Sequence, residues 1–313
     1  MNNKGSLHLL TALVITVALC GALGYLSSEA AYAAGQKVFG TPEEAAKALI
    51  EACKVNDRAA LMELFGDSAR DMVITSDEAL EKAWRREFYD WALEAQKLEK
   101  KQDGKIVVIV GVKEWPFPIP LIKDGQGWCF DTASGRVEIL NRRVGMDELK
   151  AISACRAYVK AQKQYADKDR NGDDVLEYAQ KIGSSPGKKD GLYWPDEKDA
   201  ELSPLGPLVA EAGDYGKARK QGDPYYGYYF RILNGQGDKA AGGAYDYLIN
   251  GHMLAGFALL AYPAAYRSSG VMTFMVNSNG RVYQKDLGAD TAGTAGAMEK
   301  YNPDSTWKLV EEE

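Results

Sequence analysis

Histidine is nearly absent from this chain, which has 2 histidines in 313 residues, and only His252 lies beyond the first 34. A Ser-His-Asp triad needs an imidazole as its general base, and a multi-histidine zinc centre needs several imidazoles as ligands. With one histidine beyond the first 34 residues, a multi-histidine zinc centre is excluded, and a Ser-His-Asp triad would have to use His252. His252 stands in the glycine-flanked segment Asn250-Gly-His-Met253, which supplies no orienting partner, and we expect it to have no catalytic role.

An excess of positive charge is also missing. The chain has 38 Lys and Arg against 44 Asp and Glu, so its net charge is -6 and its pI is about 5.3. Such a chain has no overall positive field to attract phosphate backbones or anionic lipid. We therefore expect no nucleic acid partner, and membrane contact only through the N-terminal segment.

Cysteine is scarce, with 4 in the chain, and Cys20 lies in the first 34 residues. The other three are Cys53, Cys129 and Cys155. An odd number allows one disulfide and one free thiol, and the sequence does not fix which cysteines pair. For Cys53, which shares a helical stripe with Leu49, a buried thiol is the simpler interpretation.

Only one long hydrophobic run is present, at residues 9–26. Lys4 precedes it, and Ala31-Tyr32-Ala33 follows with the small-x-small pattern of a signal peptidase site. The pattern predicts a signal peptide over residues 1–34 and a periplasmic or extracytoplasmic location. The alternative is an uncleaved anchor in the inner membrane, because residues 9–26 are just long enough to span a bilayer.

Residues 38–146 have the pattern of a helical domain that ends in a strand meander. Thr41-Pro42-Glu43-Glu44 predicts a helix start, and a longer helix is expected over residues 76–100. Residues 106–112 and 127–132 have the β-branched and aromatic composition of strands. Between them, the segment 115–120 has proline at every second position, which predicts a rigid connector unable to donate to a sheet, or alternatively a ligand for a partner.

Residues 147–313 are expected to form a second domain, with its boundary near Asp147. An amphipathic helix is predicted over residues 147–166, followed by a short helix that ends at Ile182. Four strands are then predicted in an antiparallel meander, with a turn at Asn234-Gly235 and a hairpin loop after it. The strands are expected at residues 225–233, 257–262, 271–276 and 281–285.

The expected fold class is therefore α+β, with two small domains that each pack helices on an antiparallel sheet. The first is expected to be of the nuclear transport factor 2-like kind. The second contains two candidate sites but no recognisable catalytic residue.

One candidate is an oxygen-rich segment that follows the predicted helix. Asp167, Asp169 and Asn171 alternate as ligands do in an EF-hand loop, and Asp173 and Glu177 follow them. We predict a calcium site of modest affinity, and calcium is the only cofactor that the sequence suggests. The alternative is a solvated turn in which these side chains bind their own backbone.

The other candidate is a group of aromatic residues with His252. Tyr226 and Tyr228 lie in a tyrosine-rich strand that would offer rings for stacking on cell-wall sugars, and with His252 they are our candidate ligand-binding residues. The alternative interpretation is that these tyrosines are half-buried core residues.

Several blocks of the sequence point to a family when they are taken together. The blocks are Trp115-Pro-Phe-Pro-Ile-Pro-Leu121, Glu138-Ile-Leu-Asn-Arg-Arg143, Asp190-Gly-Leu-Tyr-Trp-Pro195, Ser203-Pro-Leu-Gly-Pro207, Gly270-Val-Met-Thr-Phe274 and Tyr283-Gln-Lys-Asp-Leu-Gly288. In this order they resemble the bacterial family called domain of unknown function 2950. The resemblance implies an exported bacterial protein without an established activity, so it transfers no catalytic residue.

Residues 147–288 more loosely resemble the globular part of type IV pilin-like proteins. No prepilin cleavage motif with an acidic half-helix precedes them, so only the fold would be shared. We expect an exported envelope protein that is a structural or interaction module. Its partner would be an envelope protein or a cell-wall component. The alternatives are a periplasmic glycan- or peptide-binding protein and, after it, a hydrolase.

Overall fold

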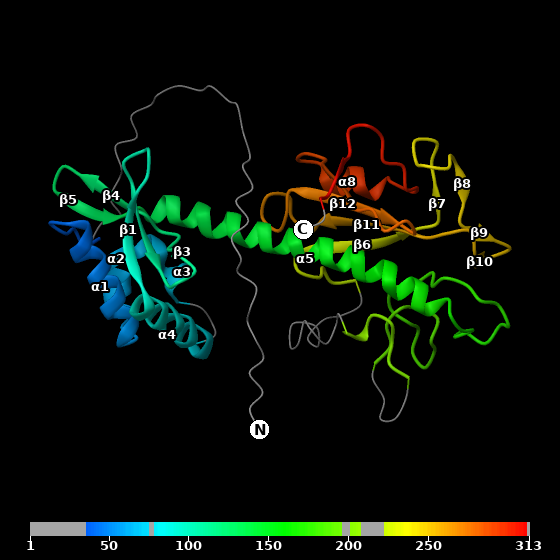
Figure 1. Cartoon of the computed structure of the whole chain (residues 1–313), viewed down its shortest axis with the longest axis horizontal. Helices are drawn as coiled ribbons and strands as arrows, with labels where there is room; N and C mark the ends of the chain where they lie inside the picture. The colour runs from blue at the N-terminus through cyan, green and yellow to red at the C-terminus, as the bar shows by residue number, and fades with distance from the viewer. Residues whose placement is uncertain (1–35, 75–77, 196–200, 208–221, 312–313) are drawn as a thin grey trace.

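The computed structural model describes residues 36–74, 78–195, 201–207 and 222–311. They form two lobes joined by one long helix, α5 (Thr132–Tyr165), which runs from the first lobe across the second (Figure 1). Within the described residues, no helix combines the length and the apolar character needed to cross a membrane. The predicted signal peptide lies outside the described residues.

The first lobe contains the helices that precede α5. Thr41 caps α1 as expected, because its hydroxyl accepts a hydrogen bond of 3.2 Å from the backbone N–H of Glu44. Asp57 caps the next helix in the same way, through the N–H of Ala60. The helices are α1 (Pro42–Lys54), α2 (Arg58–Phe65), η1 (Asp67–Ala69), α3 (Arg70–Val73) and α4 (Glu78–Glu94).

Five antiparallel strands form the sheet of the first lobe. Its main order is β1-β2-β4-β5, and β3 pairs with β2 beside that path. Apolar side chains of α1, α2 and α4 pack on β2, β4 and β5 to form the core. The strands are β1 (Gln96–Lys100), β2 (Ile106–Val110), β3 (Trp115–Pro116), β4 (Leu121–Asp124) and β5 (Gly127–Phe130).

The helix predicted over residues 76–100 is too long at its C-terminal end. α4 ends at Glu94, and residues 96–100 are strand β1, in which Leu98 lies opposite Val108. Leu98 follows Trp91 at helical spacing, which is why the sequence extended the helix. The N–H of Gly111 binds the carbonyl groups of Trp91 and Ala95, so the end of β2 caps α4 and the chain turns into β1.

Helix α5 begins much earlier than the predicted helix over residues 147–166. Asp131 is its N-cap and accepts a hydrogen bond of 3.0 Å from the N–H of Ser134. Gly135 and Gly145 weaken the helical pattern of the first half, so the sequence revealed only the second half. The buried clusters comprise residues 45–130 in one lobe and 151–307 in the other, and the predicted boundary at Asp147 falls within the helix that joins them.

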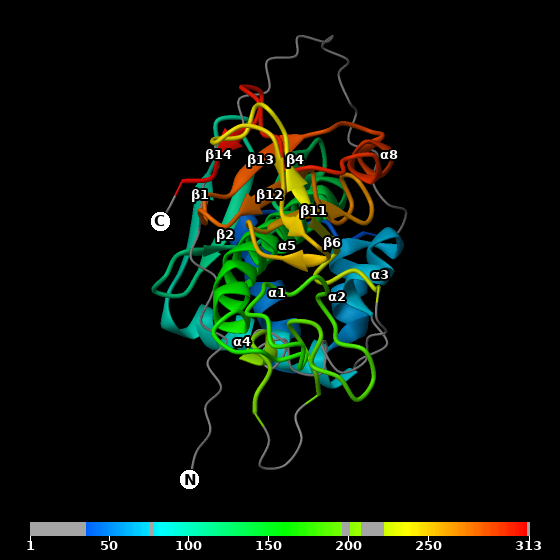
Figure 2. The ribbon, with the colours of Figure 1, turned by 90° about the vertical axis from the view of Figure 1, so that its right-hand side faces the viewer.

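The second lobe is built on a sheet of order β14-β13-β12-β11-β6. The four strands expected from the sequence are present. α5 packs on one face, and α8 (Thr291–Gly296) packs on the opposite face, where it accepts hydrogen bonds from Arg231 (Figures 1 and 2). The strands are β6 (Tyr228–Leu233), β11 (Ala258–Pro263), β12 (Met272–Asn277), β13 (Tyr283–Asp286) and β14 (Lys308–Leu309).

Two small hairpins extend from this sheet. β7 (Gly235–Gln236) pairs with β8 (Tyr245–Asp246), so the predicted hairpin loop is present. The predicted tight turn at Asn234-Gly235 is not, because Gly235 continues from β6 directly into β7. The second hairpin pairs β9 (Leu248–Ile249) with β10 (His252–Met253).

The short helix predicted to end at Ile182 does not form. Instead, the buried side chain of Gln162 forms two hydrogen bonds with the backbone of Ala179. It accepts one from the N–H and donates one to the carbonyl, each at 2.8 Å. Tyr178 pairs with Met253 of β10. These long-range hydrogen bonds replace the local ones of a helix.

Candidate functional site

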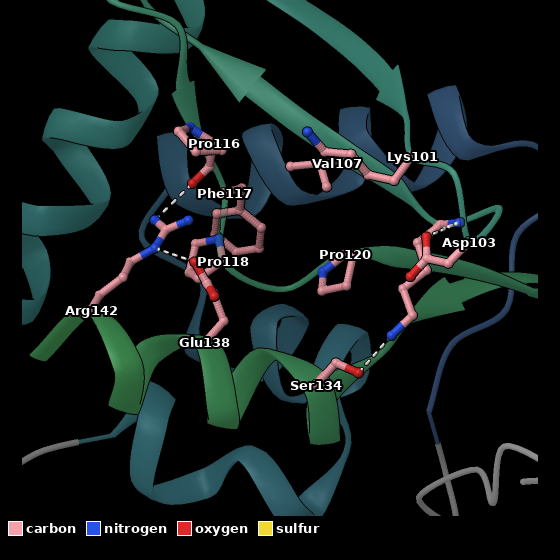
Figure 3. Close-up of a pocket in the computed structure, with 11 residues that line it drawn as sticks. Lys101, Asp103, Val107, Pro116, Phe117, Pro118, Pro120, Ser134, Glu138 and Arg142 are labelled. Atoms are coloured by element: carbon pink, nitrogen blue, oxygen red, sulfur yellow. Dashed lines mark hydrogen bonds and ion pairs between the residues drawn. The ribbon is translucent and has the colours of Figure 1, made fainter. Parts of the chain in front are cut away.

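A groove opens in the first lobe between the start of α5 and the proline-rich connector, with a volume of about 340 Å³ (Figure 3). Prolines and one aromatic ring form its apolar middle, and ionic side chains lie at its two ends. The lining residues are Lys101, Asp103, Lys105, Val107, Pro116, Phe117, Pro118, Pro120, Ser134, Glu138 and Arg142.

The helical wall of the groove consists of Ser134, Glu138 and Arg142, which are four residues apart and so share one face of α5. Arg142 donates from Nε to Glu138 at 2.8 Å and from Nη1 to the carbonyl of Pro116 at 2.8 Å (Figure 3). Its guanidinium also lies over the Trp115 ring. Arg142 therefore ties the helix to the connector.

The other end of the groove holds Lys105, Asp131 and Ser134. Lys105 Nζ donates to Asp131 Oδ2 at 3.0 Å and to Ser134 Oγ at 2.8 Å, and Ser134 Oγ donates to Asp131 Oδ2 at 2.6 Å. The sequence did not reveal this group, because Lys105 is 26 and 29 positions from its two partners.

A serine beside a lysine is also found in Ser-Lys hydrolases, where the serine is activated as a nucleophile. Burial alone would raise the pKa of Asp131, but hydrogen bonds from Ser134 and Lys105 outweigh it and hold that pKa below its ordinary value. Lys105 donates to Ser134 Oγ and so does not accept its proton; Ser134 directs that proton to Asp131, and a carboxylate with a lowered pKa is a weak base. The group is therefore suited to capping α5 and fixing the groove rather than to activating Ser134.

The proline-rich wall is held by its own aromatic residue. Phe117 packs against the rings of Phe65, Phe88 and Phe130, with centroids 5.3 to 6.1 Å away. The connector was expected to make no sheet hydrogen bond, but Phe117 N–H donates to the carbonyl of Val108 at 2.7 Å. The rigid-connector interpretation fits this packing.

A second cluster lies in the other lobe, where Asp173, Glu177 and His252 each bring one donor atom within 4.8 Å of the others. His252 Nδ1 is 3.4 Å from Glu177 Oε2 and 3.5 Å from Asp173 Oδ2. The expectation that His252 has no orienting partner was wrong, because its partners lie about 75 positions away in sequence.

The five residues of the predicted calcium loop do not converge as a group. Asp169 accepts hydrogen bonds from the N–H groups of Gly172 and Asp174, at 2.7 and 2.9 Å, and these hold its pKa below the ordinary value. Asp167 is exposed and lies outside the cluster. Asn171 lies between Asp173 and Glu177 but presents its Nδ2 to both, at 2.7 Å.

The predicted ligand-binding tyrosines occupy different environments. Tyr228 is fully buried, and its hydroxyl donates to the carbonyl of Met272 at 2.8 Å, so it offers no face to a sugar. Tyr226 packs edge-on against Tyr225, with Lys150 over its ring. Tyr229 of the same tyrosine-rich strand is exposed instead, and it pairs with the half-buried Tyr262, with ring centroids 5.6 Å apart; Tyr262 was not singled out from the sequence.

All three cysteines in the described residues are buried thiols, and no disulfide joins any two of them. Burial raises the pKa of the Cys53 thiol to about 12, and it does the same for Cys155. Neither is poised as a nucleophile, because the thiolate is the reactive form.

Comparison with known proteins gives one match. A family model described as "Protein of unknown function (DUF2950)" matches residues 36–310. No curated protein matches the chain, and no solved structure matches it either. The α+β class is confirmed, whereas the nuclear transport factor 2-like and pilin-like assignments are not.

Proposed function

The chain belongs to the DUF2950 family of proteins of unknown function, and we propose that it is exported and serves in the cell envelope as a non-catalytic interaction module. Its contact surface would be the groove of the first lobe, and its ligand a short extended segment of a partner protein. The charged, apolar and small-residue order of residues 1–34 supports export.

The shape of the groove carries the proposal. From Ser134 to Arg142 the helical wall rises about 12 Å, which matches about four residues of extended peptide. The opposite wall, from Pro116 to Pro120, is tied to α5 by Arg142, so the groove is formed before a ligand arrives. Binding to a preformed groove costs less free energy, because its walls do not have to become ordered when the ligand binds.

The chemistry of the groove favours recognition over reaction. Lys105 is paired with Asp131 and Arg142 with Glu138, so the two ends are electrically balanced. Phe117, Val107 and the prolines offer apolar surface between these ends. The matching ligand is an extended segment with apolar side chains and little net charge.

A matched pair of substitutions tests the groove. Val107 lines it, whereas Val112 lies outside it and is 75% exposed, so Val107→Glu and Val112→Glu make the same change at two places. With the full chain as bait in envelope extract, we expect Val107→Glu to reduce recovery of the specific partner at least about tenfold, and Val112→Glu to leave it unchanged. Equal recovery by both variants, at matched melting temperatures, would contradict the groove proposal.

Export is tested separately by N-terminal sequencing of the protein from envelope fractions. We expect the sequence to begin near Ala34. An intact Met1 on envelope-bound protein would instead support the anchor formed by residues 9–26.

Glycan binding is the second candidate, and the pair Tyr229 with Tyr262 is the observation that favours it. These two rings are tilted at 44° to each other and partly exposed, and exposed aromatic faces can stack on sugars. Cosedimentation with insoluble peptidoglycan tests it, and Tyr262→Ala should abolish retention if these rings bind the glycan.

A further inference from the structure

We infer that Asp173, Glu177 and His252 form a binding site for a divalent cation of the zinc class. The site lies in the second lobe and does not depend on the groove. His252 comes from β10, and the two carboxylates come from the loop that follows α5. The antiparallel bridge between Tyr178 and Met253 holds these two segments together.

Two of the three distances between donor atoms match those of ligands around a metal, and all three are within 4.8 Å. Two ligand atoms at zinc distances of about 2.0 to 2.2 Å, separated by a tetrahedral angle, are about 3.3 to 3.6 Å apart. His252 Nδ1 lies 3.4 and 3.5 Å from the two carboxylate oxygens. Among the described contacts, the imidazole lies within ion-pair distance of both carboxylates, and no hydrogen bond joins it to either one.

The charge of the cluster gives an independent argument. Glu177 is only 7% exposed, and its other partners are neutral: the Met253 N–H at 3.0 Å, the Asn171 amide at 2.7 Å and the Gln180 amide at 3.5 Å. In the part of the chain that is described, neither Glu177 nor Asp173 has a Lys or Arg within 4.0 Å. A buried carboxylate is costly without a countercharge, and a divalent cation supplies one.

The surroundings orient the ligands as the outer shell of a metal site does. Asn171 Nδ2 donates to one oxygen of each carboxylate, at 2.7 Å in both cases. Met253 N–H donates to Glu177 Oε2, the oxygen that faces His252. Such partners fix ligating carboxylates and are part of the affinity of a metal site.

The donor set selects the class of cation. One imidazole nitrogen with two carboxylate oxygens suits zinc and similar transition cations, whereas calcium takes six to eight oxygen ligands. Asp173 and His252 keep about a third of their side-chain surface exposed, so water can reach the site. Three protein ligands with one position open to water is the arrangement of an open zinc site.

Calorimetric titration of the full chain, freed of metal with a chelator, tests the site with zinc, calcium and magnesium salts. We expect one zinc per chain, and at least about 100-fold weaker zinc binding in His252→Ala and in Asp173→Asn. Asp174→Asn is the matched control: it makes the same change one residue away, outside the cluster, and at a positive φ that asparagine tolerates.

Two results would overturn the site. One is zinc binding that is absent, or equally strong in His252→Ala and in the unaltered chain. The other is calcium binding that survives His252→Ala and is lost in Asp169→Asn, which would locate an oxygen-only calcium site in the loop. Circular dichroism in chelator shows whether each variant is folded.

Discussion

Each lobe buries a glutamate, and the two have different partners. In the first lobe Glu81, 3% exposed, is bound by the guanidinium groups of Arg58 and Arg85, each 2.9 Å away. In the second lobe Glu177 has neutral donors and one imidazole. The first arrangement is electrically complete with groups of the protein, whereas among the described residues the second has no lysine or arginine within 4.0 Å.

The comparison separates a structural charge from a functional one. Arg85 also donates to the carbonyl of Val73 and to Asn56, so it joins three segments of the first lobe. Glu177 also joins two segments of the second lobe, but it lies beside the partly exposed side chains of Asp173 and His252. A buried ionic group without a full countercharge is where a ligand is to be sought.

The largest expected effect is that of removing Arg85. Arg85→Leu should lower the free energy of unfolding by about 3–5 kcal/mol, because it leaves Glu81 buried with one arginine fewer. Urea denaturation measures it. Arg86→Leu is the control on the same helix, since Arg86 is 68% exposed and its loss should leave the midpoint nearly unchanged. Equal midpoints for the two variants would show that Glu81 does not need Arg85.

The next effect compares two glycines of α5, one inside the first lobe and one between the lobes. A Cβ at Gly135 would lie 2.6 Å from Ile119, so Gly135→Ala should destabilise by about 1–3 kcal/mol. A Cβ at Gly145 meets nothing within 4 Å, so Gly145→Ala should stabilise by about 0.5–1 kcal/mol through helix propensity. Thermal melts decide, and two shifts of the same sign would contradict this placement of α5.

Two aspartates of α5 and its cap should give the lobes opposite responses to pH. Burial raises the pKa of Asp147 from 3.8 to about 6, whereas that of Asp131 is lowered. The ionisation of Asp147 therefore lowers the free energy of unfolding as the pH rises from about 4 to 6. Ionised Asp131 instead stabilises the fold, and this contribution is lost as the pH falls through the lowered pKa of Asp131. Asp147→Asn should raise stability by roughly 1 kcal/mol at pH 8, a figure discounted for partial exposure, and by nothing at pH 3.5. A gain that is the same at both pH values would refute the assignment.

A smaller effect is expected at Glu177 when metal is absent. In chelator, Glu177→Gln should change the free energy of unfolding by less than about 1 kcal/mol, since the amide keeps one acceptor and removes an uncompensated charge. Urea denaturation beside Arg85→Leu makes the comparison direct. A loss as large as that of Arg85→Leu would mean that Glu177 is as structural as Glu81.

The smallest effect is an expected lack of reaction. Cys53 and Cys129 in the first lobe and Cys155 in the second are buried, so none should react with iodoacetamide in the native chain within an hour. All three should react in urea. Mass spectrometry counts the labels, and labelling of one lobe alone would identify it as the one that opens more readily.

Local patterns in the sequence were sufficient for the elements that depend on local physics. Thr41 and its neighbours predicted the start of α1, and the β-branched run at Ile106 predicted β2. The start of α5 was missed because its first half packs through glycine and bound charges rather than through an apolar stripe.

The candidate sites were harder to predict because their residues meet only in the folded chain. His252 and Asp173 were both singled out from the sequence, but for different roles, and nothing local indicated that they meet. Lys105 and Ser134 were not singled out at all. The loop to Ile182 was predicted as a helix because local spacing does not show that Gln162 captures Ala179.

Helix α5 also fixes the geometry between the lobes. Its 34 residues rise about 50 Å along the helix axis, and each residue is rotated by about 100° around that axis relative to the one before it. The number of residues between the two cores therefore sets both the distance between the lobes and the angle by which one lobe is rotated relative to the other about the helix axis. One residue inserted near Gly145 would change the distance by about 1.5 Å but turn the second lobe by more than a quarter of a revolution. The binding of any partner that contacts both lobes at once would therefore be sensitive to the insertion or deletion of a single residue in this helix.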